Sequence, residues 1–298
     1  MNNDAILQSI VALRTSIPDD AFTAATLGTL REGSGVVIRE DGLVLTIGYL
    51  IVEAEEVWLT RVDGQVVPAH ALAYDQETGF GLVQPLGSLG VDAVALGDTS
   101  AVDVGDPVLL ADGIGQFLDA NIIARQEFAG YWEYLLDEAI FVAPAHSSWG
   151  GAALLGRDGK LLGIGSLRLQ ASGTGDINMF VPINLLPPIL DDLINRGRVN
   201  KPPRPWLGAF SAETNGKVVI MSVAQGGPAA QAGLRQGDVI SEVRGDEVDG
   251  LADFYRKVWM SGSAGAEIPM RVLRNGREAW LRIKSADRSN FLKKPQMQ

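Results

Sequence analysis

The sequence contains no cysteine among its 298 residues, and this absence excludes several kinds of site. Without thiols there is no disulfide framework, no thiolate zinc or iron–sulfur centre and no cysteine nucleophile. Basic residues are also in deficit, because 25 Lys and Arg stand against 36 Asp and Glu, for a net charge of −11. A protein that binds nucleic acid needs a basic face for the phosphates, so we expect no nucleic-acid partner.

Long apolar runs are missing as well. No run in the sequence reaches the length of about 18 residues that a membrane-spanning helix needs. The first twenty residues lack the basic and apolar regions of a secretory signal, which predicts a cytoplasmic location, or a periplasmic one if a leader was removed. The content of 46% hydrophobic and 20% charged residues is typical of a globular protein, and the length predicts about two domains.

Charge and proline content divide the chain near residue 200. From Pro205 onward there are 13 basic and 10 acidic residues, whereas the first 204 residues hold 12 basic and 26 acidic ones. The change falls in residues 197–205, which contain Gly197 and three prolines and therefore favour extended backbone. We place a linker at residues 197–204.

Between about residues 33 and 185 the pattern is one of short apolar runs separated by turn residues. Asp-Gly pairs at 41–42, 63–64 and 158–159 are typical of hairpin turns, so this part is predicted to form a β-sandwich or β-barrel. Four segments are predicted to be helical, at residues 4–14, 187–196, 228–232 and 251–260.

Three stretches resemble the HtrA family of trypsin-like serine proteases that carry PDZ domains. They are residues 33–46, residues 164–166 together with 178–184, and residues 205–208 together with 227–240. The resemblance implies a mostly β fold, a trypsin-like double β-barrel followed by a PDZ domain, with a short N-terminal helix. The boundaries expected are 1–32 for the N-terminal helix and extension, 33–196 for the double barrel, 197–204 for the linker, 205–286 for the PDZ domain and 287–298 for the tail.

The resemblance also indicates where a Ser-His-Asp triad would lie, and all three positions are replaced. Tyr49 stands where the family has its general-base histidine, Gly79 where it has the aspartate, and Trp149 where it has the nucleophilic serine. A tyrosine with a pKa near 10 is a poor base at neutral pH, a glycine has no side chain, and an indole offers only an N–H donor. These replacements predict a pseudoprotease that is not an enzyme, with only backbone amides around residues 147–149 left as an oxyanion hole.

A relocated site is the alternative. His146 lies next to Ser147 and two residues from Ser148, so a serine endopeptidase with a non-standard site at these residues stays open. The other histidine, His70, is expected to be a surface or packed residue. The acidic clusters Glu53-Glu55-Glu56 and Asp191-Asp192 are expected to be solvated and not metal-binding, and neither a metal nor a cofactor is predicted.

Peptide binding is what the resemblance implies for the C-terminal part. Such a domain adds a peptide as a strand and holds its terminal carboxylate with loop amides. The predicted peptide-binding residues are Trp206, Leu207, Gly208 and Ala209 in the loop and Leu251, Phe254 and Val258 on the facing helix. A closed groove, in which these residues only form the core, is the competing interpretation. The aromatic run Phe128, Tyr131, Trp132 and Tyr134 is interpreted either as a strand packed between barrels or as an exposed anchor for a partner.

Three functions are therefore open. The favoured one is an adaptor or scaffold that binds protein or peptide C-termini through the PDZ groove. The others are the endopeptidase with a non-standard site and a structural subunit of a larger complex. The resemblance also suggests a homotrimer.

Overall fold

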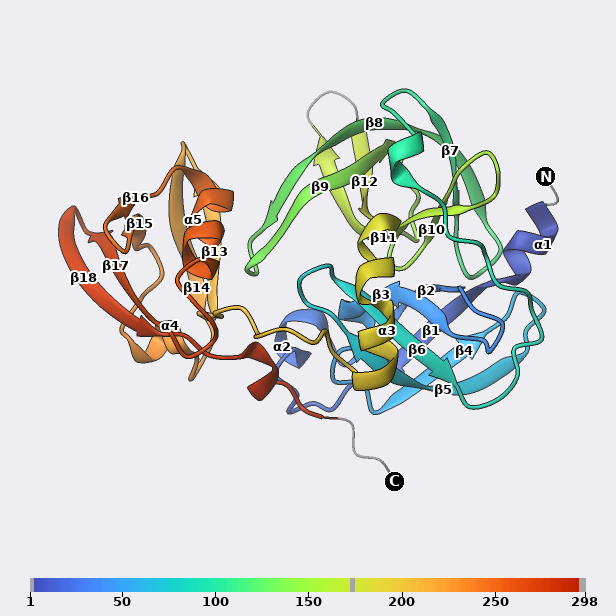
Figure 1. The fold of residues 1–298 in the computed structure, drawn as a ribbon, viewed down its shortest axis with the longest axis horizontal. Helices are drawn as coiled ribbons and strands as arrows, with labels where there is room; N and C mark the ends of the chain where they lie inside the picture. Colours follow the sequence, from blue (N-terminus) through green and yellow to red (C-terminus); the bar gives the residue numbers. More distant parts are fainter. Residues whose placement is uncertain (1–2, 172–174, 295–298) are drawn as a thin grey trace. The chain divides into compact units, whose positions relative to one another are not determined.

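The computed structural model describes residues 3–171 and 175–294 and is built mainly of β-strands (Figure 1). The predicted mostly β fold, with a trypsin-like domain before a PDZ domain, is confirmed. The chain divides into two compact units. One comprises residues up to Gln126, residues 138–200 and the segment from Leu292, and the other comprises residues 127–137 and 201–291. Among the described residues, no helix has the length and hydropathy needed to cross a membrane.

The first unit begins with a closed antiparallel barrel in the strand order β1-β2-β3-β6-β5-β4. Its strands are β1 (Ile10–Ser16), β2 (Leu30–Val37), β3 (Val44–Ile47), β4 (Glu56–Thr60), β5 (Val66–Tyr74) and β6 (Phe80–Pro85). Two short helices flank β1, namely α1 (Asn3–Gln8) and α2 (Ala24–Leu27). Strands alternate buried and exposed side chains only where one face meets solvent, and all four residues of β3 are buried.

A second closed barrel in the same unit has the order β10-β11-β12-β9-β8-β7. Its strands are β7 (Pro107–Ala111), β8 (Phe117–Gly130), β9 (Tyr134–Ala143), β10 (Ala153–Leu155), β11 (Leu161–Ala171) and β12 (Gly175–Pro182). β8 and β9 form a long hairpin, drawn in green in Figure 1. The helix predicted over 187–196 is present as α3 (Pro187–Arg196), and Gly197 ends it in the left-handed conformation, as is common at helix C-termini.

The second unit contains a sheet in the order β13-β14-β15-β17-β18, with β16 beside β15. Its strands are β13 (Ala209–Thr214), β14 (Lys217–Val223), β15 (Val239–Val243), β16 (Asp246–Glu247), β17 (Glu267–Arg274) and β18 (Arg277–Lys284). The helices are α4 (Pro228–Gln231) and α5 (Gly250–Trp259), close to the two predicted segments. β13 is an edge strand in this order.

The prediction of a helix over residues 4–14 is wrong in its second half. The helix ends at Gln8, and Ile10–Ser16 is a strand that pairs with both β2 and β4. The first barrel therefore starts at Ile10 and not at residue 33. The reason is that the β-branched Ile10, Val11 and Thr15 favour a strand, and all three are fully buried in the barrel.

Candidate functional site

The structure brings together the three positions where the resemblance indicates a triad. Tyr49 lies in the 3-10 turn η1 (Gly48–Leu50) directly after β3, Gly79 lies just before β6, and Trp149 lies in the loop before β10. The Gly48 amide donates to the Gly79 carbonyl at 2.7 Å. The Trp149 indole is hydrogen-bonded to the Tyr49 hydroxyl. The two barrels thus meet at these positions through a phenol and an indole.

Tyr49 serves in this site as a hydrogen-bond donor. Its hydroxyl donates to the Ser166 carbonyl at 3.0 Å, across the two barrels. Burial raises the pKa of the Tyr49 phenol above its ordinary value, and the hydrogen bond to Trp149 offsets only part of the rise. The phenol is therefore protonated at neutral pH and does not accept a proton from a nucleophile. These three positions do not hold the parts of a Ser-His-Asp triad.

A buried network fixes the backbone around Tyr49. The Arg31 guanidinium donates to the carbonyls of Tyr49 at 2.7 Å and Val52 at 3.1 Å, and also to the Thr23 hydroxyl at 2.8 Å. Burial lowers the pKa of Arg31 to about 10, and the charge of Glu53 works against that decrease, so the guanidinium stays charged at neutral pH. The site backbone is thereby held by a cation that is itself inside the protein.

Glu53 completes this network, and the prediction that its cluster is solvated is wrong for this residue. Its side chain is buried and accepts from the amides of Phe22 and Thr23 and from the Thr23 hydroxyl. Burial alone would raise the pKa of Glu53, but the hydrogen bonds from Thr23, Lys293 and Phe22 bring it below its ordinary value. Glu55 and Glu56 are exposed, as expected.

The loop before β10 places His146 inside the protein. His146 is buried, its Nδ1 accepts from the Ser148 amide at 3.1 Å, and its Nε2 lies 3.9 Å from Asp112 Oδ2. A neutral imidazole with an occupied Nδ1 carries its proton on Nε2, which faces the carboxylate. Neither nitrogen is then available to take a proton from a serine hydroxyl, although Ser147 is exposed beside it. The Ser148 amide is also engaged, so it is not a free donor for an oxyanion hole. His70 is an exposed residue of β5.

In the second unit, the predicted carboxylate-binding loop does hold a carboxylate, which comes from the tip of the β8–β9 hairpin. Glu133 Oε1 accepts from the amides of Gly208 at 2.7 Å, Ala209 at 3.0 Å and Leu207 at 3.2 Å, and its Oε2 accepts from Leu207 at 3.0 Å. Gly208 has a φ of +72°, and a Cβ there would lie 3.0 Å from the Trp206 ring. The loop needs glycine to turn its amides inward.

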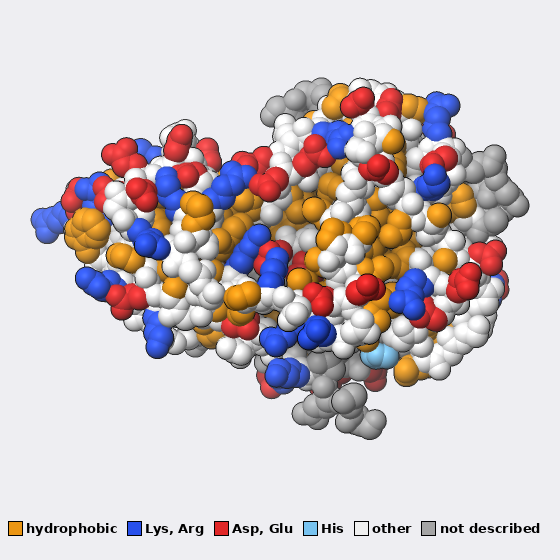
Figure 2. All heavy atoms as spheres, viewed as in Figure 1, with side chains coloured by type: hydrophobic (Ala, Val, Ile, Leu, Met, Phe, Trp, Pro, Cys, Tyr) orange, Lys and Arg blue, Asp and Glu red, His pale blue; other side chains and the backbone are white. Residues whose placement is uncertain are grey.

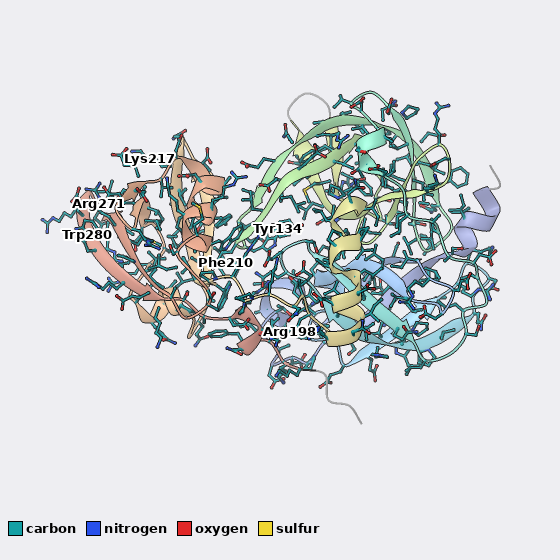
Figure 3. All side chains as sticks on the ribbon, viewed as in Figure 1. Tyr134, Arg198, Phe210, Lys217, Arg271 and Trp280 are labelled. Carbon is teal, nitrogen blue, oxygen red and sulfur yellow. The ribbon has the colours of Figure 1, made fainter. Side chains whose placement is uncertain are left out.

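The helix predicted to face this loop is present as α5. Leu251, Phe254 and Val258 of α5 are buried in the core of this unit, and Leu135 of the hairpin belongs to that core. Tyr131 and Phe210 pack with ring centroids 6.3 Å apart, and Figure 3 labels Phe210 on β13 and Tyr134 on the hairpin. The aromatic run is thus part of the second unit and not a strand packed between the barrels.

Glu133 is the functional residue that sequence reasoning missed. It is the single acidic residue in the aromatic run Tyr131-Trp132-Glu133-Tyr134. The one signal for it is a carboxylate within an apolar, strand-forming segment, because such a group must find donors when it is buried.

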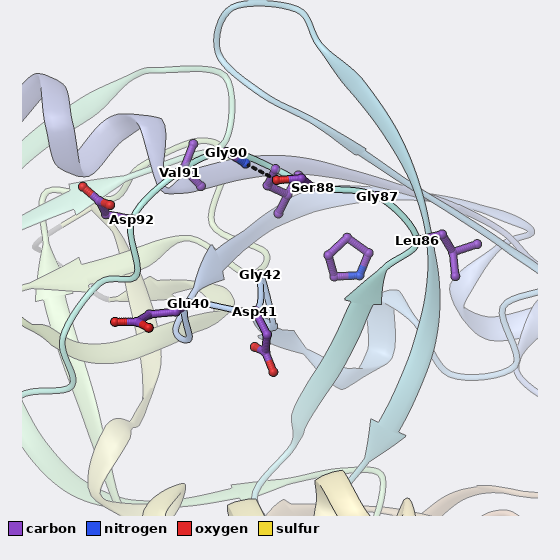
Figure 4. Close-up of a pocket in the computed structure, with 11 residues that line it drawn as sticks. Glu40, Asp41, Gly42, Leu86, Gly87, Ser88, Gly90, Val91 and Asp92 are labelled. Carbon is purple, nitrogen blue, oxygen red and sulfur yellow. Dashed lines mark hydrogen bonds between the residues drawn. The ribbon is translucent and has the colours of Figure 1, made fainter.

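One pocket and the distribution of surface charge give weaker indications of a functional site. A pocket of about 480 Å³ in the first unit is lined by residues 40–42 and 85–92, which include the carboxylates of Glu40, Asp41 and Asp92 as well as apolar side chains such as Leu86 and Val91 (Figure 4). In the part of the chain that the structure describes, no group of three His, Asp or Glu residues is arranged to hold a metal ion. In Figure 2 the Lys and Arg side chains are interspersed with Asp and Glu on the face in view, which offers phosphates no uniform basic surface.

Comparisons with known proteins agree with the two units. The trypsin-like peptidase domain family matches residues 33–164, and the PDZ domain family matches residues 205–284. The serine protease Do-like HtrA of Bacillus subtilis is 25% identical over 284 residues, covering 85% of this chain and 63% of the relative. A probable periplasmic serine endoprotease, DegP-like, of Halomonas elongata is 27% identical over 263 residues, covering 82% of this chain and 54% of the relative. The solved structure of the HtrA-type protease AlgW with a decapeptide has the same fold, with a TM-score of 0.57, 23% identity and coverage of 98% of both chains.

These comparisons correct one prediction. The sequence predicts that the chain is not an enzyme, but the relatives it matches are named serine proteases and endoproteases, and this contradicts that prediction. The chain spans 63% and 54% of the length of the two curated relatives described above.

Proposed function

Because this chain is a homologue of the HtrA/DegP serine proteases, with a trypsin-like peptidase domain and a PDZ domain, we propose that it binds polypeptide segments through its PDZ groove, as an adaptor or scaffold. The observation that carries the proposal is the convergence of three successive amides, from Leu207 to Ala209, on one carboxylate. Such an amide nest recognises a carboxylate of any origin, including that of a chain terminus.

The groove has the other parts that an extended ligand needs. β13 is an edge strand and α5 supplies an apolar wall, and the outer backbone groups of an edge strand can pair with an added strand. The occupants we propose are segments with a carboxylate and an apolar side chain close to it. A cytoplasmic location and a trimeric state stay predictions from the sequence.

The test uses fluorescent decapeptides that end in leucine, made once as the free acid and once as the C-terminal amide. We expect the full chain to bind the acid at least tenfold more tightly than the amide in fluorescence anisotropy, at concentrations up to the millimolar range. Gly208→Ala should remove this preference, because the new Cβ meets the Trp206 ring. Gly216→Ala is the matched control, since its φ is +70° and its Cβ would meet no atom within 4 Å. Equal binding of acid and amide would refute the proposed function.

Serine endopeptidase activity at Ser147 or Ser148 is the second candidate, and the names of the relatives favour it. It needs a rearrangement in which His146 Nδ1 leaves the Ser148 amide and turns toward a serine hydroxyl. A fluorophosphonate probe would then label the wild-type chain, and Ser147→Ala or Ser148→Ala would abolish the labelling. Ser88→Ala, which changes a serine of the open pocket, is the control. A wild-type chain that takes up no probe and leaves casein intact would refute this candidate.

A further inference from the structure

The PDZ groove of this chain is already occupied. The segment Glu127–Asp137, called here the hairpin tip, belongs to the PDZ unit although it connects two strands of the second barrel. On one side, the Ser211 amide of β13 donates to the Tyr131 carbonyl at 2.9 Å, as in strand addition. On the other side, the Tyr255 hydroxyl of α5 donates to the Gly130 carbonyl at 2.8 Å and accepts from the Glu133 amide at 3.3 Å.

Two side chains of the hairpin tip supply what a terminal residue would supply. The Glu133 carboxylate, with the residue 5% exposed, takes all three loop amides. Leu135, 9% exposed, joins the apolar core that includes Ala209, Phe254 and Val258. A carboxylate and an aliphatic side chain thus fill the two subsites, although the chain continues through the groove. Glu133 adopts a φ of +58°, a conformation that is uncommon for a residue with a side chain and that is held here by the contacts around it.

We propose that the hairpin tip is an intramolecular ligand of the PDZ groove, and that a polypeptide with a free C-terminal carboxylate and an apolar last residue binds only by displacing Glu133 and Leu135. This inference rests on the proposed function, because it concerns access to the same groove. The groove is then closed in the free protein, and it opens when a polypeptide competes with the hairpin tip for the same contacts.

The contacts at the base of the hairpin tip allow such an exchange. Arg256 of α5 pairs with Glu127 at 2.5 Å and with Asp137 at 2.6 Å. These three side chains are 42–87% exposed to solvent, so the pairs hold the segment weakly. A tethered ligand acts at an effective concentration of about 1 mM. If the hairpin tip itself binds the groove with an intrinsic Kd of about 0.1 mM, it weakens the apparent affinity of any competing peptide about tenfold.

The first probe is a fluorescent peptide with the sequence of residues 127–137, added to full-length chains. It should bind the double variant Glu133→Ala/Leu135→Ala at least tenfold more tightly than the wild type, whose groove is filled. Glu138→Ala is the matched control, because this carboxylate lies on the same hairpin but pairs with Arg125 and not with the loop. The control should bind the probe as weakly as the wild type does.

A second variant protects the test against misfolding. Leu135→Ala leaves the Glu133 carboxylate in place and removes only the aliphatic side chain from the core of the unit, and it should bind the same probe at least threefold more tightly than the wild type. Circular dichroism of each variant shows whether the strands are intact. Equal affinity of the probe for the wild type and for the folded variants would overturn the inference, as would a failure to bind any of them.

Different results would contradict the proposed recognition of C-termini and the proposed closure of the groove by the hairpin tip. On the double variant, the leucine-ended decapeptide acid should bind at least tenfold more tightly than its amide. If the 127–137 peptide binds the variant but the acid has no advantage over the amide, the internal ligand stands and recognition of C-termini is wrong. If the acid binds the wild type as tightly as it binds the double variant, closure is wrong and the proposed function stands.

Discussion

Protonation of Glu133 should control how firmly the hairpin tip is held. Burial raises the pKa of Glu133 to about 7, from an ordinary value of 4.5, and the hydrogen bonds from Ala209, Leu207 and Gly208 limit this rise. The charged and titratable groups that act on it are the Arg288 guanidinium, whose charge lowers the pKa, and the Tyr255 phenol, whose own pKa the carboxylate raises. A group with a raised pKa binds its proton more tightly in the docked state than in the released one. The docked hairpin is therefore most stable at low pH and loses stability as the pH rises from 4.5 to 7, with no further loss above that range.

The size of the effect follows from the two pKa values. At about 1.36 kcal/mol for each unit of pKa difference, the free energy of opening should fall by about 2.5 kcal/mol between pH 5 and pH 8. Hydrogen exchange at the amides of Leu207, Gly208 and Ala209 measures that free energy directly, because these amides exchange only when Glu133 leaves them.

The same measurement on Glu133→Gln is the control, since this variant has no group that titrates at the loop. Its opening free energy should be constant over the same pH range after correction for intrinsic exchange. A wild-type value that stays constant, or that rises with pH, would refute the reasoning, because it would mean that the three amides lower the pKa at least as much as burial raises it.

Three further predictions concern the stability of each unit, measured as the free energy of unfolding in urea. At Gly151, φ is +75° and a new Cβ would lie 1.9 Å from a backbone carbonyl oxygen. Gly151→Ala should therefore lower the free energy of unfolding by about 3 kcal/mol, and an unchanged midpoint would contradict this. Thr15 donates to the buried Leu50 carbonyl at 2.7 Å. Thr15→Val should lower the stability by about 1 to about 2 kcal/mol by removing this hydrogen bond, whereas Thr15→Ser should retain most of it. Burial would raise the pKa of the Asp238 carboxyl, but Arg274 brings it below 3.8. Asp238→Asn should cost about 2 kcal/mol at neutral pH, and the difference from the wild type should shrink in acid below that pKa; a cost that is independent of pH would exclude the role of the charge.

The strand-rich fold could be predicted because residues that are neighbours in the sequence determine its turns. The Asp-Gly pair at 41–42 lies between β2 and β3, and the Pro and Gly residues around α3 mark both of its ends, as their backbone preferences require. The segment Ile10–Ser16 could not be assigned in the same way. Its apolar residues fit a helical period in the sequence, and only pairing with β2 and β4, which lie further along the chain, decides that it is a strand.

The candidate site was predictable in part for the same reason. The loop at Trp206–Ala209 has a short motif that points to carboxylate binding, and its amides do converge on a carboxylate. The source of that carboxylate lies 74 residues before Leu207, and nothing near Glu133 indicates where it will bind. The sequence neighbours of His146 suggest a dyad with a serine. In the structure, however, the imidazole is buried next to Asp112 and accepts from the Ser148 amide, and these contacts decide which hydrogen bonds it makes.

The separation between Glu133 and its loop has a consequence for synthesis on the ribosome. The amides that receive the carboxylate follow it by 74 to 76 residues. At about 5 to about 20 residues per second, they are made roughly 4 to roughly 15 seconds later. During that interval the nascent hairpin lacks the later residues that Tyr131, Glu133 and Leu135 contact in the folded unit. A chain released before residue 207 would keep this hairpin tip permanently uncovered. We therefore expect truncated products to be the species that chaperones retain and that aggregate first.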